Sequence, residues 1–201
     1  MELGRDLTVL IFDFDGTLFH LDVRWESVRR KLDVGATETL GEAIQRLALA
    51  EDASLAVVTA TELAALGDRR LDPAVAGTLE ALAARYRIAV LTRNSREVVL
   101  RAFAGTTVAD SLYVVGREDS ALLKPDPAGL RMVLDHFEVG PAQAVLIGDT
   151  YHDVEAARAA GMCCVVVHND RLAYRPTGAD RYLNQIADLL PLLTERNRAQ
   201  C

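Results

Sequence analysis

The sequence predicts a doubly wound α/β fold, a parallel sheet with helices on both faces, and a small helical cap inserted after the first strand. Five short runs are rich in Val, Ile and Leu and do not alternate with polar residues, which is typical of strands buried on both faces. Helical patterns separate the last four runs, as in a doubly wound sheet. The runs are residues 7–12, 87–92, 111–115, 144–149 and 163–167.

Start and stop signals support the helices between these strands. Asn94 is a candidate N-cap, and Glu97 three residues later completes a capping-box pattern. Asp126 suits an N-cap and Pro127 suits the first turn of the next helix. The other expected helices are a stretch leading into the second strand from about residue 71, the stretch ended by Gly161, and a final helix over 182–193.

The stretch from about 20 to 70 interrupts the alternation of strand and helix. Apolar residues recur at helical spacing over 21–32 and again over 40–48. The stretch 53–67 is also helical in character, although its "LAVV" segment leaves a strand open. We therefore expect residues 1–19 and 71–201 to form the α/β core domain and residues 20–70 to form a small helical cap.

Composition and charge narrow the function classes. Half of the 201 residues are apolar and a quarter are charged, which is ordinary for a globular protein with a sizeable core. A net charge of −7 and a pI of about 5.1 argue against general affinity for nucleic acid or anionic membranes. No apolar run approaches transmembrane length, and no secretory signal is recognisable. The cysteines, Cys163, Cys164 and Cys201, fit a reducing, cytoplasmic location better than disulfides or zinc.

Polar residues collect where the predicted strands end. Ligands of open α/β sheets bind outside the carboxyl ends of the strands, near the point where the strand order reverses. Several carboxylates, one ammonium group and one hydroxyl are expected together on this rim. They belong to Asp13, Asp15, Thr92, Lys124, Asp149 and Asp153.

The spacing of the aspartates favours a metal site. Asp13 and Asp15 are two residues apart, so an extended backbone points both to one side, and Gly16 then allows a turn and close approach by a ligand. Asp149 and Asp153 are four residues apart and share one face of a helical turn. Because converging carboxylates repel, we expect a hard divalent cation, and all-oxygen ligation favours Mg²⁺.

Lys124 adds a positive charge to this rim, so the site suits an anion whose charge the metal and the ammonium group share. Phosphate fits this description. A GxxxxGK[ST] loop is absent from the sequence, so a nucleotide kinase or GTPase mechanism is not supported.

Four segments, in order, resemble the motifs of the haloacid dehalogenase superfamily, and the resemblance spans nearly the whole chain. The insertion lies where the C1 cap of that superfamily lies, and the ensemble looks most like the phosphoglycolate-phosphatase-like branch. The first and fourth motifs are specific for this superfamily, whereas the second and third motifs, which rest on a single Thr and a single Lys, would not be specific by themselves. The segments are "DFDGTL" at 13–18, Thr92 in "VLTRN", Lys124 in "LKPDP" and "IGDTYHDVEAA" at 147–157.

The resemblance implies catalytic roles that agree with the chemistry of these side chains. Asp13 would be the nucleophile that forms an aspartyl phosphate. Asp15 would protonate the leaving alcohol and then activate water. Thr92 and the backbone amides after Asp13 would bind the phosphoryl oxygens, and Lys124 would offset charge on the nucleophile and the phosphoryl group.

The resemblance also implies a metal site and substrate contacts. Mg²⁺ would be held by the Asp13 carboxylate, the backbone carbonyl of Asp15 and Asp149, with Asp153 close behind. Asn94 is a plausible substrate contact, whereas Arg93 departs from the small or polar residue expected there. We expect the cap to set substrate choice. The expected substrate-binding residues are Gly16, Arg93, Asn94, His20 and Arg24.

These roles predict a Mg²⁺-dependent phosphatase that hydrolyses a small phosphomonoester, phosphoglycolate-like or a sugar phosphate. A β-phosphoglucomutase-like phosphotransferase uses the same carboxylates and stays an alternative, as does a non-catalytic protein that binds a phosphorylated ligand. A 2-haloacid dehalogenase lacks the metal and the second aspartate, so Asp15 counts against it. The expected partner is a small phosphorylated metabolite, and the sequence leaves its identity and the oligomeric state open.

Overall fold

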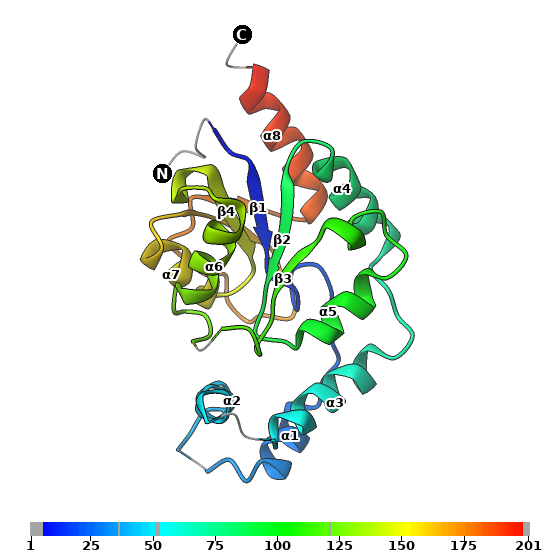
Figure 1. Ribbon diagram of the computed structural model, residues 1–201, viewed down its shortest axis with the longest axis vertical. Coiled ribbons are helices and arrows are strands. Elements are labelled where there is room, and N and C mark those ends of the chain that lie inside the picture. Colours follow the sequence, from blue (N-terminus) through cyan, green and yellow to red (C-terminus); the bar gives the residue numbers. More distant parts are fainter. Residues whose placement is uncertain (1–5, 36, 51–52, 121, 199–201) are drawn as a thin grey trace.

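The computed structural model describes residues 6–35, 37–50, 53–120 and 122–198, and this part of the chain contains one six-stranded parallel sheet (Figure 1). The strand order is β3-β2-β1-β4-β5-β6. Cys201 lies outside the described residues. The strands are β1 (Val9–Phe12), β2 (Arg87–Leu91), β3 (Tyr113–Val115), β4 (Ala144–Gly148), β5 (Cys163–Val167) and β6 (Arg181–Leu183).

The order of the strands reverses at β1, which lies between β2 and β4. Phe12 pairs with Val90 on one side and with Ile147 on the other, so the three strands end at the same level. The pairing continues for one more residue, because the Asp13 amide donates to the Ile147 carbonyl at 2.8 Å. The residues that follow β1, β2 and β4 therefore meet at one edge of the sheet, where ligands of open α/β sheets bind.

Helices cover both faces of the sheet, which confirms the doubly wound fold. One apolar cluster lies under α4, α5 and α8, and a second lies under α6 and α7. The strands between them are almost wholly buried, as their continuous apolar sequences indicate. These helices are α4 (Pro73–Ala83), α5 (Arg96–Phe103), α6 (Ala128–Phe137), α7 (Tyr151–Ala159) and α8 (Leu189–Arg198).

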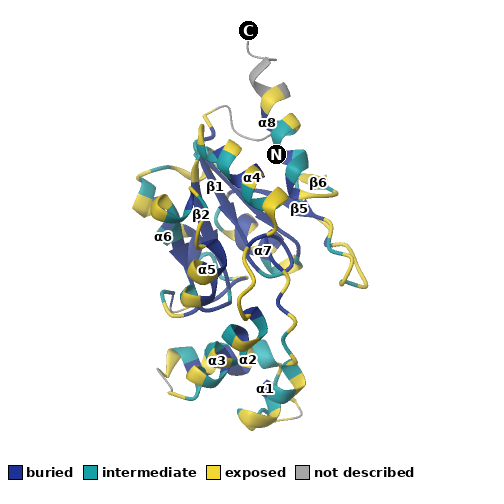
Figure 2. Cartoon of the chain, turned by 90° about the vertical axis from the view of Figure 1, so that its right-hand side faces the viewer, coloured by how far each residue is buried: buried dark blue, intermediate teal, exposed yellow. Residues whose placement is uncertain are grey.

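The insertion folds into α1 (Trp25–Lys31), α2 (Leu40–Leu49) and α3 (Leu55–Leu66), which lie apart from the sheet in two orthogonal views (Figures 1 and 2). Their apolar faces meet in a small cluster of their own. The cluster also includes Leu123, which is buried and comes from the core. At its other end, α3 inserts Leu66 into the apolar cluster of the sheet. No helix in the described ranges is long and apolar enough to cross a bilayer.

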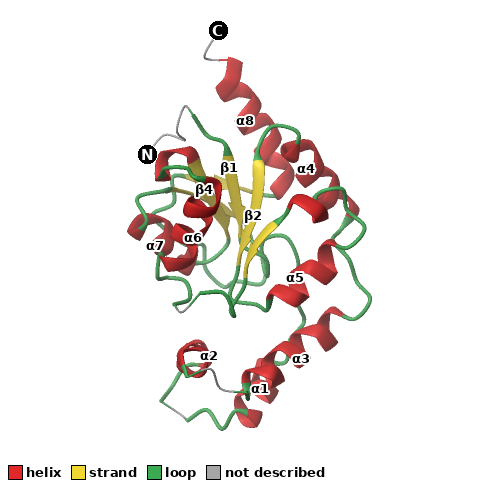
Figure 3. Cartoon of the chain, in the orientation of Figure 1, coloured by secondary structure: helices red, strands yellow, loops and turns green. Residues whose placement is uncertain are grey.

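Element boundaries differ from the sequence prediction at several places (Figure 3). Ser95, not Asn94, caps α5, because its hydroxyl accepts from the Glu97 amide at 3.3 Å. The "LAVV" segment is helical, within α3. The predicted final helix over 182–193 was wrong at its start, since residues 182–183 belong to β6 and α8 begins at Leu189. Three residues without an apolar run give no recognisable strand signal.

Candidate active site

Three buried carboxylates meet where β1 and β4 end. The groups of Asp13, Asp149 and Asp153 each offer an oxygen, and these atoms lie within 4.8 Å of one another. Lys124, also buried, lies between two of them, with Nζ 2.8 Å from Asp13 Oδ1 and 2.6 Å from Asp153 Oδ1. The structure therefore brings together four residues that the sequence predicted from separate segments.

Neighbouring donors hold two of these carboxylates in place. The Thr150 amide donates to Asp153 Oδ2 at 3.0 Å, as part of the capping box of α7, and the Thr150 hydroxyl donates to the same oxygen at 2.7 Å. The Thr17 hydroxyl donates to Asp149 Oδ1 at 3.1 Å, and Asn169 Nδ2 donates to Asp149 Oδ2 at 2.6 Å. Asp153 therefore has two roles: it stabilises the first turn of α7, and it holds Lys124 in position.

The two oxygens of Asp13 have different surroundings. Oδ1 accepts from the Phe14 amide at 2.7 Å and contacts Lys124. Among the described residues, Oδ2 accepts no hydrogen bond, so it is the oxygen available to a metal or to an electrophile. Burial raises the pKa of Asp13 to about 7, although Lys124 acts to lower it.

The cluster has more negative charge than its lysine neutralises. Burial raises the pKa of Asp149 to about 6, against the hydrogen bonds that it accepts. Burial acts in the same direction on Asp153, but Lys124 and Thr150 outweigh it and hold that pKa below its usual range. For Lys124, burial is outweighed by Asp13 and Asp153, which raise the pKa of the ammonium group.

The donor set fits a hard divalent cation. It consists of carboxylate oxygens, and two of the three carboxylates have raised pKa values because Lys124 offsets their burial only in part. A cation of two charges would stabilise their ionised forms, and oxygen ligands are those that Mg²⁺ prefers.

The turn after β1 brings the backbone close to this cluster. Gly16 has φ +93°, and a Cβ there would lie 2.2 Å from Asp149 Oδ2, so only glycine fits. Asp15 precedes it, and its Oδ1 accepts from the Leu21 amide at 2.8 Å. Burial raises the pKa of Asp15 to about 6, and the Leu21 hydrogen bond acts against this. The residue therefore exchanges a proton near neutral pH.

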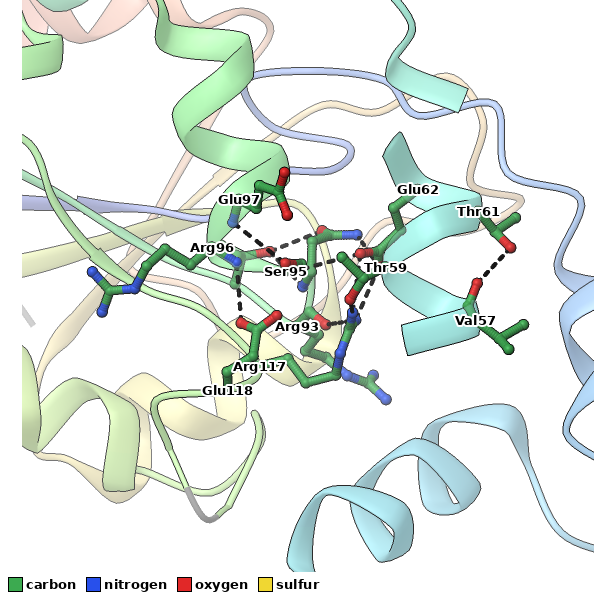
Figure 4. Close-up of polar contacts among 12 residues, drawn as sticks. Val57, Thr59, Thr61, Glu62, Arg93, Ser95, Arg96, Glu97, Arg117 and Glu118 are labelled. Atoms are coloured by element: carbon green, nitrogen blue, oxygen red, sulfur yellow. Dashed lines mark hydrogen bonds and ion pairs between the residues drawn. The ribbon is translucent and has the colours of Figure 1, made fainter. Parts of the chain in front are cut away.

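The loop after β2 is held by a network that the sequence did not predict (Figure 4). The Thr92 hydroxyl donates to Asn94 Oδ1 at 2.9 Å, and Asn94 Nδ2 donates to Glu62 Oε1 at 3.0 Å. Glu62 belongs to α3 and pairs with Arg117 from the loop after β3, with 3.0 Å between Nη1 and Oε1.

A cavity of about 410 Å³ opens above Asp13, between the sheet edge and the inserted helices. Asp15, Thr92, Asn94 and Lys124 border it from the core, and Glu62 borders it from α3. Apolar side chains of α1 and α2 form the other side. These are Trp25, Leu40 and Ile44.

Arg93 also lines this cavity, and its guanidinium lies against the first turn of α2. A Cβ at Gly41 would lie 2.3 Å from Arg93 Nη2. Arg93 Nη1 donates to His152 Nε2 at 3.2 Å. Burial, with Arg93 beside it, lowers the pKa of His152 to about 4, so the imidazole is neutral. Two other predicted substrate contacts, His20 and Arg24, are exposed and are not among the residues that line the cavity.

Comparisons with known proteins agree with this arrangement. A family model described as haloacid dehalogenase-like hydrolase matches residues 70–167. Phosphoglycolate phosphatase from Cupriavidus necator is 33% identical over 93% of this chain and 93% of its own length. The enzyme of the same name from Rhodospirillum rubrum is 33% identical, over 79% and 78%. A crystal structure of a predicted phosphoglycolate phosphatase from Haemophilus somnus has a TM-score of 0.70 at 22% identity, covers 94% of this chain and 98% of that chain, and shows the shared fold.

The chain therefore belongs to the haloacid dehalogenase-like hydrolases, as its four motifs indicated. Within that family it falls in the phosphoglycolate-phosphatase-like branch and is a phosphatase, a phosphoric monoester hydrolase. The non-catalytic alternative is thereby set aside.

Sequence reasoning missed several residues of the site. Thr17 lies within the first motif, and Asn169 follows β5 at the same edge of the sheet, so both could have been found by position. Glu62 and Arg117 have no comparable signal, because the helix and loop that bring them together are 55 residues apart in sequence.

Proposed function

We propose that this protein is a Mg²⁺-dependent phosphatase that hydrolyses a small phosphomonoester bearing a second anionic group, through an aspartyl phosphate on Asp13. The observation that supports this most directly is the position of Asp13. Its Oδ1 is fixed by Lys124 and the Phe14 amide, whereas Oδ2 has no hydrogen-bond partner among the described residues, and the residue lines the cavity.

In the proposed reaction, Asp13 Oδ2 attacks phosphorus while the bond from phosphorus to the ester oxygen breaks. Asp15 donates its proton to the departing alkoxide. Asp15, now ionised, takes a proton from a water molecule that attacks the phosphoaspartyl group, and the bond between Asp13 and phosphorus breaks. A pKa of about 6 suits Asp15 to both steps.

The remaining polar groups stabilise charge on the phosphoryl group. Lys124 lies beside the attacking carboxylate, and Thr92, just after the end of β2, lines the same cavity. We infer that Asp13, Asp149 and the backbone carbonyl of Asp15 hold Mg²⁺, with Asp153 supporting them. The metal would neutralise charge on the phosphoryl oxygens.

Substrate choice is proposed to depend on Arg93 and on residues 20–70 acting as a cap. Among the described residues that line the cavity, Arg93 is the cation without a carboxylate partner. A guanidinium in that position suits a carboxylate or second phosphate on the substrate. The two relatives at 33% identity are named for phosphoglycolate, which has such a carboxylate.

The test compares phosphoglycolate with an uncharged alkyl phosphate of similar size, using phosphate release with Mg²⁺ or with EDTA. Wild-type protein should require the metal and prefer phosphoglycolate. Arg93→Met should raise the KM for phosphoglycolate about tenfold or more and leave the alkyl phosphate unaffected. Arg131→Met, on the exposed side of α6, is the matched control.

Two results would overturn the proposal. Turnover that persists in EDTA would contradict the metal dependence. An equal loss of activity on both substrates in Arg93→Met would contradict the proposed second anionic group on the substrate. A requirement for a sugar bisphosphate would favour the phosphotransferase alternative.

A further inference from the structure

A fully buried ion pair joins the inserted helix α3 to the core beside the active site. The side chains of Glu62 and Arg117 are each 1% exposed. Arg117 makes a two-pronged contact, with Nη1 donating to Glu62 Oε1 at 3.0 Å and Nη2 donating to Oε2 at 3.1 Å. Figure 4 shows the two side chains pointing toward each other between α3 and the loops of the sheet edge. The pair is therefore not a surface contact of the insertion.

Further donors from the core complete the coordination of Glu62. Asn94 Nδ2 donates to Oε1, and the Ser95 amide donates to Oε2 at 3.1 Å. Arg117 in turn donates to the Arg93 carbonyl at 2.9 Å and to the Thr59 hydroxyl at 2.9 Å. Each oxygen of Glu62 thus accepts two hydrogen bonds, one from Arg117 and one from the loop after β2.

These contacts determine which way the Asn94 amide faces. A carboxylate can only accept, so Glu62 requires the Nδ2 end of Asn94. The Oδ1 end then faces Thr92 and accepts from its hydroxyl, while the Asn94 backbone amide donates to the same hydroxyl at 3.1 Å. Glu62, itself held by Arg117, therefore fixes the position of the Thr92 hydroxyl through one intervening side chain, that of Asn94.

A purely structural role explains this arrangement poorly. A buried ion pair gives little or no stability over apolar side chains of the same volume, because desolvation offsets the attraction. The apolar ends of α3 already pack on both sides, with Val58 in the cluster of the inserted helices and Leu66 in that of the sheet. Apolar side chains, however, could not accept the hydrogen bonds that the Asn94 side-chain amide and the Ser95 backbone amide donate to Glu62.

We propose that Glu62 and Arg117 are positioning residues for the phosphoryl-binding loop, so that a residue of the inserted segment completes the core's own catalytic site. This rests on the proposed phosphatase function. Glu62 does not touch the reacting atoms. It acts through Asn94 on the position of the Thr92 hydroxyl oxygen, which accepts from the Asn94 backbone amide. The hydroxyl hydrogen is donated to Asn94 Oδ1 in this structure, and in the proposed reaction it rotates to donate to the phosphoryl oxygens as charge develops on them.

The experiment separates positioning from stability. Glu62→Met and Arg117→Met each leave a buried partner unsatisfied, so both single variants should lose thermal stability and kcat. The double variant removes both charges at similar volume, so its Tm should recover toward that of wild type. Its kcat should stay at least tenfold below that of wild type, with a smaller change in KM, because the side-chain amide of Asn94 is then free to flip.

Thr59→Val is the matched control, because it removes one contact of Arg117 and none of Glu62. It should keep wild-type kcat. A double variant that regains both Tm and kcat would show a structural role only and would overturn the inference. If a single variant fails to fold, the double variant still decides the question.

Binding of inorganic phosphate with Mg²⁺, measured by calorimetry, gives a readout that does not need turnover. Weaker binding in the double variant than in wild type supports positioning, and equal binding contradicts it. Wild-type protein that binds phosphate but hydrolyses no phosphomonoester would overturn the proposed function alone. Wild-type protein that neither binds nor hydrolyses would overturn both.

Discussion

At the scale of single residues, Asp13 combines two tasks on one carboxylate. Oδ1 is held by Lys124 and by the Phe14 amide, and Oδ2 accepts no hydrogen bond from the described residues. Asp13→Asn keeps the shape but removes the charge needed for attack and for metal binding. We expect turnover to fall by several orders of magnitude, measured as phosphate release, with the fold checked by circular dichroism. Near-normal turnover in a folded variant would contradict the covalent mechanism.

Asp15 has a separable role, because its proton matters most when the leaving group is a poor one. Asp15→Asn should slow hydrolysis of alkyl phosphates more than that of aryl phosphates, whose leaving groups need less protonation. The ratio of kcat/KM for the two classes measures this. Equal loss on both classes would argue against the acid role.

The sequence predicted the residues of the carboxylate cluster because each follows a strand or starts a helix with a clear pattern. It misassigned Asn94 as a helix cap, since Asn and Ser are both good caps and stand side by side. The structure uses Ser95 for that purpose and leaves Asn94 to bridge Thr92 and Glu62. Contacts of this kind depend on the packing of distant elements, which no local pattern records.

At the scale of elements, the first turn of α2 is shaped around Arg93. A methyl group at Gly41 would displace the end of a flexible side chain rather than backbone. Gly41→Ala should therefore leave Tm unchanged or slightly higher, since Ala favours helix, while the KM for phosphoglycolate rises. Thermal denaturation and steady-state kinetics on one preparation measure both. A lower Tm with unchanged KM would contradict this account of α2.

Long elements with strong patterns were predicted well, and short or exposed ones were not. The buried strands and the helices of the core could be read from continuous apolar runs and caps. β6 was not predicted, because its residues are only slightly buried and its pairing with β5 is set by tertiary packing. The insertion was predicted as helical, but how α1 to α3 lie over the cavity depends on side-chain contacts between them and the core.

At the scale of the whole molecule, stabilisation by Mg²⁺ should grow with pH. Burial raises the pKa of Asp13 to about 7 and of Asp149 to about 6, both from 3.8. Without metal, the folded state therefore loses stability as pH rises through this range and the buried groups ionise. A bound cation offsets this loss, because it competes with protons for the same oxygens.

We expect excess Mg²⁺ to change Tm by about a degree or less at pH 5 and by several degrees at pH 8, relative to EDTA. Scanning fluorimetry at both pH values measures the increments. Asp149→Asn, which removes one of the cluster's carboxylates, should abolish the increment at pH 8. Equal increments at pH 5 and pH 8 in wild-type protein would contradict the assignment of the cluster as the metal site.

The burial of Lys124 has a practical consequence, because the sequence contains one other lysine, Lys31. Lys31 is exposed on α1, whereas Lys124 is 5% exposed and forms ion pairs with two carboxylates. An amine-directed reagent such as formaldehyde with a borane should methylate Lys31 within minutes and Lys124 far more slowly, as peptide mass spectrometry would show. The labelling rate of Lys124 would then report how often the catalytic centre opens to solvent, with Lys31 as the internal reference in the same molecule.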